Sequence, residues 1–161
     1  LTLIPMVKEQ VKIPVIAAGG IGSGRGMLAA MVLGADGVQI GSKFAATVES
    51  SAHQKFKDVI VDVKDGDTQL TLKELAPVRL VKNQFFNEVQ ELYKTNPSKE
   101  ELNKLLGRAR AKKGMFEGDL ENGELEIGQI AGLIHEIKPV KEVFNEIIEE
   151  FNSVKSLIHR F

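Results

Sequence analysis

Two short apolar segments that each end in glycine, with a helix of small residues between them, constrain the fold most strongly. The first segment is VKIPVIAA (11–18), the helix is MLAAMVL (27–33), and the second segment is GVQIGS (37–42). A continuous apolar run is typical of a strand covered on both faces, and therefore of a parallel sheet. The order strand, helix, strand predicts a right-handed βαβ unit and an α/β fold.

The segment before the first strand also has helical character. Leu3, Ile4 and Val7 have helical spacing, and the proline of KIP then favours extended backbone. A helix that leads into a buried strand is half of an αβ unit, and the chain starts with Leu1. We therefore expect this chain to be the C-terminal piece of a longer protein.

The remaining sequence is predicted to be mostly helical. We expect a helix after the second strand, one strand within 65–72, and a segment at 78–93 that begins extended and becomes helical. Ser98 and Glu101 have capping-box spacing, and a short apolar helix is expected from about Gly128. The last helix, from Pro139, has an apolar face of Val140, Val143, Phe144, Ile147, Ile148, Phe151, Val154, Ile158 and Phe161. Its opposite, solvated face comprises Lys141, Glu142, Glu146, Glu149, Glu150 and Lys155.

Composition excludes several classes of protein. The chain has 161 residues and no cysteine, which excludes disulfides, thiolate metal sites and a cysteine nucleophile within it. Its 21 basic and 22 acidic residues give no general attraction to nucleic acid or to anionic membranes. No membrane span or secretory signal is evident, so we expect a cytoplasmic protein with no nucleic-acid or membrane partner.

The glycines at the two strand ends suggest a phosphate site. Gly19 and Gly20 end the first strand, and Gly41 and Ser42 end the second. Bare backbone lets N–H groups approach an anion, and the helix that follows the first strand points its N-terminus toward the same region. In (β/α)8 barrels the loops after strands seven and eight frequently hold a phosphate in this way. The alternative is that these glycines serve tight packing alone.

A dinucleotide-binding fold is disfavoured. The G-x-G-x-x-G spacing fails from Gly20 because Arg25 stands at its last position. A G-x-G-x-x-A match from Gly24 lies several residues beyond the strand end. No acidic residue ends the second strand, where Gln39 and Gly41 stand.

Several polar residues have two readings. Gln39, in a short buried strand, either faces a ligand or bonds to core backbone, and the pattern favours neither. Gln129, at the start of a small-residue helix, poses the same question. Asn83 and Gln84, with Arg79, could line a pocket mouth, but a helix-capping role fits them better.

No residue of this chain is predicted to be catalytic or to bind a metal. His53, His135 and His159 read as surface histidines, His53 in a polar stretch and the other two on helices. No His, Asp and Glu group has metal-ligand spacing, and Ser50 and Ser51 lack a nucleophile-elbow context.

The motifs together resemble a known family. IPVIAAGGIGSGRGMLAAMVLGADGVQIGSKF, then ESSAHQKFK, VRLVKNQF and GDLENGELEIGQIAGLI resemble the nitronate monooxygenase (2-nitropropane dioxygenase) family, from about Ile13 to Ile134. That family includes the flavin-dependent enoyl-acyl-carrier-protein reductases. The resemblance implies an FMN-dependent (β/α)8 TIM barrel with a smaller, mostly helical inserted domain. Residues 1–50 would then be the C-terminal βαβ part of the barrel, 51–125 the inserted domain, and 126–161 helices that pack back on the barrel.

The resemblance also implies cofactor-binding residues. The family motifs that hold the FMN phosphate correspond to Gly19, Gly20, Gln39, Ile40, Gly41 and Ser42, and Gln129 of the GQ-x-AGL motif lies near the cofactor. Family members usually have threonine where Ser42 stands, and serine keeps the hydroxyl. The family's catalytic histidine lies upstream of this segment. This piece alone is therefore expected to be inactive and to need the N-terminal half of the barrel.

Four functions follow from these readings. The first is a nitronate monooxygenase that oxidises alkyl nitronates with O2, and its nearest rival is an NAD(P)H-dependent enoyl-acyl-carrier-protein reductase. An inosine monophosphate dehydrogenase-like nucleotide-binding barrel and a non-catalytic fragment are the alternatives of other classes. The expected partners are a small substrate, either a nitronate or an enoyl thioester, and the other half of the barrel. A homodimer is also compatible with the sequence.

Overall fold

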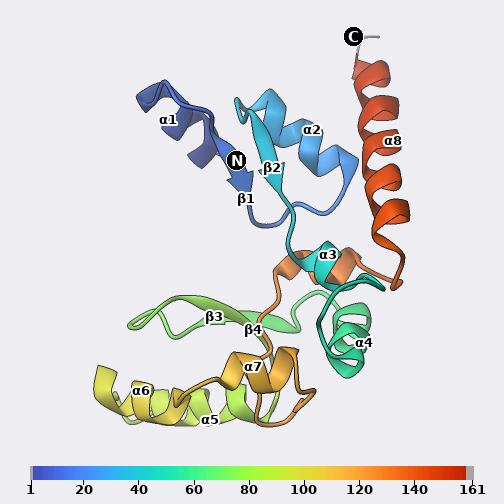
Figure 1. Ribbon diagram of the computed structural model, residues 1–161. Helices are drawn as coiled ribbons and strands as arrows, with labels where there is room; N and C mark the ends of the chain where they lie inside the picture. The colour runs from blue at the N-terminus through green and yellow to red at the C-terminus, as the bar shows by residue number, and fades with distance from the viewer. Residues whose placement is uncertain (1, 159–161) are drawn as a thin grey trace.

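The N-terminal part of the structure is a βαβ unit. The computed structural model describes residues 2–158, so the predictions for Leu1, His159 and Phe161 lie outside the described residues (Figure 1). Helix α1 (Leu3–Gln10) leads into β1 (Ile16–Ala18), and α2 (Gly24–Val32) joins β1 to β2 (Gly37–Gln39). The two strands pair in parallel, with Ala18 opposite Gln39, which confirms the predicted unit. Both strands are shorter than predicted.

The prediction that the first strand is covered on both faces is wrong for the described residues. Ala17 is buried, but Ile16 is 56% exposed and Ala18 is also exposed. One face of β1 packs with Ala30 and Ala35 in a small cluster. An apolar groove of about 530 Å³ lies between α1, β1 and α2, and its lining includes Ala17 and Ala30 of the packed face. Ile16 and Ala18 alternate with Ala17 along the strand, so their exposed side chains lie on the other face. The sheet is therefore covered on one side.

The middle of the chain forms a second region. After β2 come α3 (Ser42–Ala45) and α4 (Gln54–Asp62), then an antiparallel pair, β3 (Thr68–Thr71) and β4 (Val78–Val81). Helices α5 (Gln84–Tyr93), α6 (Lys99–Leu106) and α7 (Arg110–Met115) follow. The single strand within 65–72, the change from strand to helix at 78–93 and the capping box at Ser98 are confirmed.

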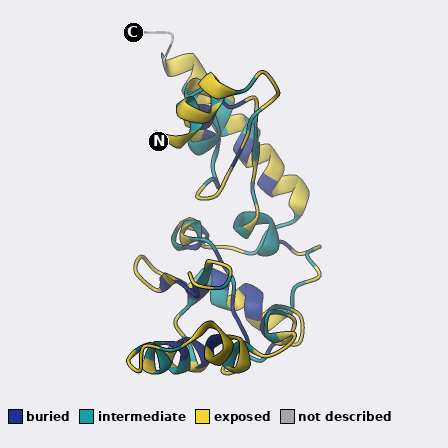
Figure 2. Ribbon diagram, turned by 90° about the vertical axis from the view of Figure 1, so that its left-hand side faces the viewer, coloured by how far each residue is buried: buried dark blue, intermediate teal, exposed yellow. Residues whose placement is uncertain are grey.

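Two hydrophobic clusters hold this region together, and its buried residues are dark in Figure 2. The first cluster comprises Ala46, Phe56, Ile60, Val63, Leu125, Ile127, Ala131 and Ile134. The second comprises Leu72, Leu80, Phe85, Phe86, Val89 and Leu102. The first cluster joins residues 46–63 to residues 125–134, so the chain returns to the same core after the three helices. The division at 50/51 and 125/126 stays a prediction.

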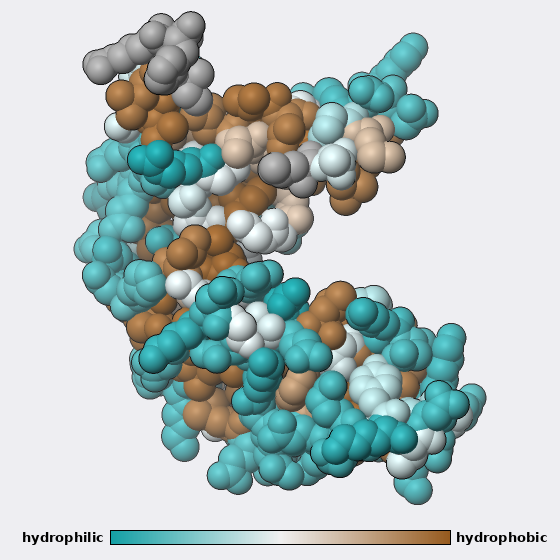
Figure 3. Space-filling view, turned by 180° about the vertical axis from the view of Figure 1, so that it is seen from behind, coloured by the Kyte–Doolittle hydropathy of each residue, from teal (hydrophilic) through white to brown (hydrophobic). Residues whose placement is uncertain are grey.

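The C-terminal elements pack back toward the βαβ unit. The short 3-10 helix η1 (Gln129–Leu133) is followed by the long helix α8 (Val140–Ile158), which lies against α2 (Figure 1). A Cβ on Gly24 would overlap the backbone of Ile147 and Phe151, so only glycine permits this close approach. The buried side of α8 is narrower than predicted, because Phe144 is 56% exposed. Seen from behind, the molecule has a deep cleft between the βαβ unit and the β3–β4 region (Figure 3).

Candidate cofactor-binding site

The first glycine corner is open and sharply turned. Gly19 and Gly20 follow β1 and have φ angles of +94° and +70°, which side-chain-bearing residues rarely adopt. A Cβ on either glycine would meet no heavy atom within 4 Å. None of the hydrogen bonds among residues 2–158 uses the N–H of Gly20. This corner therefore offers accessible backbone and a donor to an approaching anion.

The second corner lies at the same edge of the sheet. Gly41 follows β2 and precedes α3, and a Cβ on it would also meet open space. Because β1 and β2 are parallel neighbours, their carboxyl ends emerge side by side (Figure 1). The first N–H groups of a helix have no partner within it, so α3 brings donors to this edge. A short extra helix after a strand is a common part of barrel phosphate sites.

Ser42 links the second corner to η1. Its Oγ accepts a hydrogen bond of 3.0 Å from the N–H of Gly128. Because a hydroxyl has a single proton and this oxygen is already an acceptor, the proton remains available to donate to an anion. A Cβ on Gly128 would lie 2.9 Å from this Oγ, so glycine is required for the contact.

The N-terminus of α2 does not face an open anion site, in contrast to the prediction. Ser23 caps the helix by accepting from the N–H of Gly26 at 3.1 Å. The carboxylate of Glu150 on α8 accepts from the N–H of Gly24 at 2.7 Å. The donors of this helix end are thus already used within the protein. Glu150 had been placed on the solvated face of the last helix, and this contact corrects that assignment.

The two glutamines are both exposed. Gln39 was predicted to lie in a buried strand, but it is exposed at the end of β2, and Ile40 after it is half-buried. Gln129 is exposed at the start of η1. Because the described residues do not close a barrel, both interpretations of Gln39, as a ligand-facing side chain and as a barrel-core amide, stay predictions, and so does the ligand-facing interpretation of Gln129.

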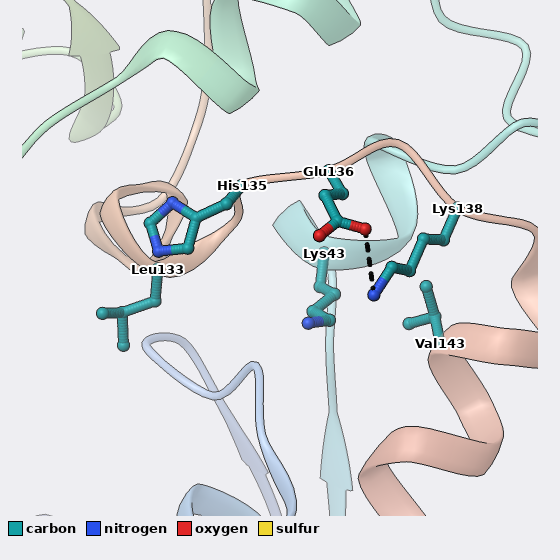
Figure 4. A pocket seen from close by; sticks show the side chains of 6 residues that line it. All are labelled: Lys43, Leu133, His135, Glu136, Lys138 and Val143. Carbon is teal, nitrogen blue, oxygen red and sulfur yellow. Dashed lines mark ion pairs between the residues drawn. The ribbon is translucent and has the colours of Figure 1, made fainter.

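A cavity of about 120 Å³ lies next to the second corner (Figure 4). Lys43, Leu133, His135, Glu136, Lys138 and Val143 line it. Lys138 forms ion pairs with Glu136 and Glu146 at 3.1 and 2.7 Å, and these bonds raise the pKa of Lys138. His135 is exposed in an extended segment after η1 and not on a helix as predicted.

The other polar residues have structural roles. Asn83 caps α5 as predicted, since its side chain accepts from the N–H of Phe86 at 2.9 Å. Its Nδ2 also donates to the carbonyls of Leu120 and Gly123, each at 2.8 Å. His53 is half-buried and caps α4 by accepting from the N–H of Lys55, so it is more than a surface histidine.

Two carboxyl groups of the β3–β4 region have perturbed protonation. Glu124 is 7% exposed, and burial, with a smaller contribution from Glu126, raises its pKa from 4.5 to about 7. Burial also raises the pKa of Glu126. Neither residue belongs to the glycine corners.

Residues 2–158 lack the features of a membrane span and of a metal site. No helix there is both long enough and apolar enough to cross a bilayer. The described residues contain no group of three His, Cys, Asp or Glu side chains that could hold a metal ion.

Comparison with protein families gives a match that spans the corners and η1. The family model described as nitronate monooxygenase matches residues 1–150. This chain belongs to that family. The chain is 34% identical to a probable nitronate monooxygenase of Staphylococcus aureus over 155 residues, covering 96% of this chain and 43% of that protein.

Solved structures share the fold of this chain. FabK from Thermotoga maritima is 42% identical with a TM-score of 0.87, covering 99% of this chain and 51% of that one. Nitroalkane oxidase from Streptomyces ansochromogenes is 30% identical with a TM-score of 0.76, covering 98% and 44%. The chain of this nitronate monooxygenase family member thus spans about half the length of its relatives. It matches about half of these TIM-barrel structures, and its described residues do not close a barrel.

Sequence reasoning missed Glu150, Lys43 and Ile130 near the corners. Ile130 packs under the β1–α2 loop, where a Cβ on Gly22 would lie 2.7 Å from its Cγ1. In the sequence, only the glycine at position 22 indicates that another segment approaches the backbone there. No local signal identifies Glu150, because its partner lies 126 positions earlier in the chain.

Proposed function

We propose that this chain is the phosphate-holding half of an FMN-dependent oxidoreductase. The observation that carries the proposal is the pair of open corners, Gly19–Gly20 and Gly41–Ser42, at adjacent carboxyl ends of two parallel strands. FMN supplies the capacity to accept and deliver electrons or a hydride. The residues of this chain bind and orient it.

The donors present in this chain fit a phosphate. The N–H of Gly20 and the first N–H groups of α3 are neutral donors, and the Ser42 hydroxyl adds a proton that its bond from Gly128 leaves available. A dianion can approach these backbone donors closely only where no side chain stands in the way. The empty space around Gly19, Gly20 and Gly41 meets this requirement. Gln129 is exposed on η1, and we propose that it contacts another part of the cofactor.

The substrate of the full-length protein is a separate proposal, and reduction of an enoyl thioester has the stronger structural support. FabK, an enoyl reductase, is 42% identical to this chain, whereas nitroalkane oxidase is 30% identical over a similar share. In this reaction a nicotinamide cofactor supplies the reducing equivalents. The catalytic acid would come from the half of the barrel that precedes these residues.

Oxidation of an alkyl nitronate by O2 is the second candidate. The family description and the names of the curated relatives favour it. The two candidates share the same phosphate site, so the corners themselves do not distinguish them.

The test uses the full-length protein. We expect purified protein to show the visible absorbance of oxidised flavin and to release FMN on denaturation. NADH with crotonyl thioester should be consumed faster than propionate 3-nitronate with O2, and the reverse ratio would favour the monooxygenase. A colourless protein that neither contains nor binds FMN would refute the flavin proposal and favour a nucleotide-binding barrel.

A further inference from the structure

The carboxylate of Glu150 makes several bonds to the start of α2. Oε2 accepts from the N–H of Gly24 at 2.7 Å and from that of Arg25 at 3.4 Å. Oε1 accepts from Nε of Arg25 at 3.0 Å. The Glu150 side chain is only 34% exposed. A carboxylate at a helix N-terminus is favoured both by the free N–H groups and by the helix dipole.

This contact lies a short distance from the first glycine corner. Four positions separate Gly20 from Gly24, and the loop between them contains no regular structure. The loop is held in its middle, where Gly22 packs on Ile130 of η1. It is held at its far end by the Ser23 cap and by Glu150. Two C-terminal elements therefore determine the path of the loop that presents the Gly20 N–H.

We propose that Glu150 is a positioning residue for the cofactor phosphate. The inference rests on the proposed function and deepens it. By fixing the first turn of α2, the carboxylate keeps the β1–α2 loop in the conformation that holds the Gly19–Gly20 corner at the same sheet edge as the Gly41–Ser42 corner. It also occupies the α2 N-terminus, so the phosphate is directed to the corners and to α3.

A purely structural role would give a different result. Packing between α2 and α8 depends on the missing Cβ of Gly24 and on buried Ile147, and both remain when Glu150 is replaced by glutamine. The glutamine variant keeps the side-chain shape but loses the negative charge that Arg25 and the α2 N-terminus bind. Cofactor affinity and loop protection should therefore change more than stability does.

The test compares Glu150→Gln with Glu149→Gln in the full-length protein. Glu149 is the exposed neighbour on the same helix, so the chemical change is matched. FMN affinity of each apoprotein is measured by quenching of flavin fluorescence, and amide hydrogen exchange is followed in peptide 19–26. We expect Glu150→Gln to raise the Kd for FMN about tenfold and to speed exchange in that peptide. Glu149→Gln should match the wild type in both measurements.

A second variant covers the case in which Glu150→Gln does not fold. Arg25→Gln removes only the partner of Oε1, and Arg25 is 67% exposed, so folding should be preserved. We expect it to raise the Kd about threefold. Wild-type affinity in either folded Glu150→Gln or Arg25→Gln would overturn the positioning role and leave the proposed function standing. Wild-type protein that binds no FMN would overturn the proposed function itself.

Discussion

Alanine substitutions at Gly20 and Gly66 distinguish an effect on protein stability from an effect on FMN affinity. Gly20 has φ +70° and Gly66 has φ +86°, and a Cβ on either would meet no atom within 4 Å. Gly66 lies in the turn before β3 and belongs to neither corner. Alanine at either position is strained only through its backbone, at about 1–2 kcal/mol. The two substitutions are therefore matched in their effect on the protein alone.

Their effects on cofactor binding should differ. A methyl group on Gly20 stands beside the free N–H that we assign to the phosphate. Loss of one hydrogen bond to a charged group costs about 1.5–3 kcal/mol, which corresponds to roughly a 10- to 100-fold weaker affinity. Gly66→Ala should leave the affinity for FMN unchanged.

The assay measures apoprotein Tm and the Kd for FMN in the two full-length variants. Both variants should lose a similar few degrees in Tm, as expected for about 1–2 kcal/mol. Only Gly20→Ala should bind FMN more weakly. If Gly20→Ala keeps wild-type affinity while its Tm falls as much as that of Gly66→Ala, the corner is not the phosphate site.

Three further predictions concern stability. Burial raises the pKa of Glu124 from 4.5 to about 7. Between these two pH values the folded protein retains a proton that the unfolded chain loses, so the free energy of unfolding falls as the pH rises from about 4.5 to 7. Glu124→Gln should remove this pH dependence and stabilise the protein at pH 8 by up to about 3 kcal/mol in urea titrations, and an unchanged pH profile would contradict the assignment. Gly24→Ala should cost about 3 kcal/mol, because its Cβ overlaps the α8 backbone, and an unchanged Tm would show that α8 is not packed there. Asn83→Ala should cost about 2–4 kcal/mol in urea titrations through the lost cap and two unpaired carbonyls, and a loss below about 0.5 kcal/mol would show that these bonds do not matter.

Local patterns explain the parts of the fold that were predicted correctly. The parallel pair β1–β2 with α2 between them follows from apolar runs and glycines within one short stretch. The capping box at Ser98 and the cap at Asn83 depend on residues three positions away. Each of these features is fixed by neighbours in sequence, which a single sequence displays directly.

Burial and long-range contacts were predicted less well. The apolar run at 11–18 predicted coverage on both faces, but residues 2–158 cover one face, and Ile16 remains 56% exposed. The hydrophobicity of a residue predicts that it is buried, but it does not identify the segment that packs against it. The bond between Ser42 and Gly128 joins positions 86 apart and leaves no periodic signal. The proposed cofactor residues were identified through the family resemblance, because their spacing alone also fits tight packing.

The two helix N-termini near the corners illustrate why spacing alone is insufficient. The sequence places α2 directly after the first corner, and a helix dipole there would attract a phosphate. In the structure that position is taken by Glu150, an anion supplied by the protein itself. Helix α3 is only one turn long, but it directly follows the open Gly41, and its first residue, Ser42, carries a hydroxyl. A phosphate at the corners would therefore be bound by α3 and the Gly20 N–H, with α2 serving to hold the loop. Charge placed at position 42 should then affect FMN binding more than charge placed at position 25, although both positions lie in the first turn of a helix.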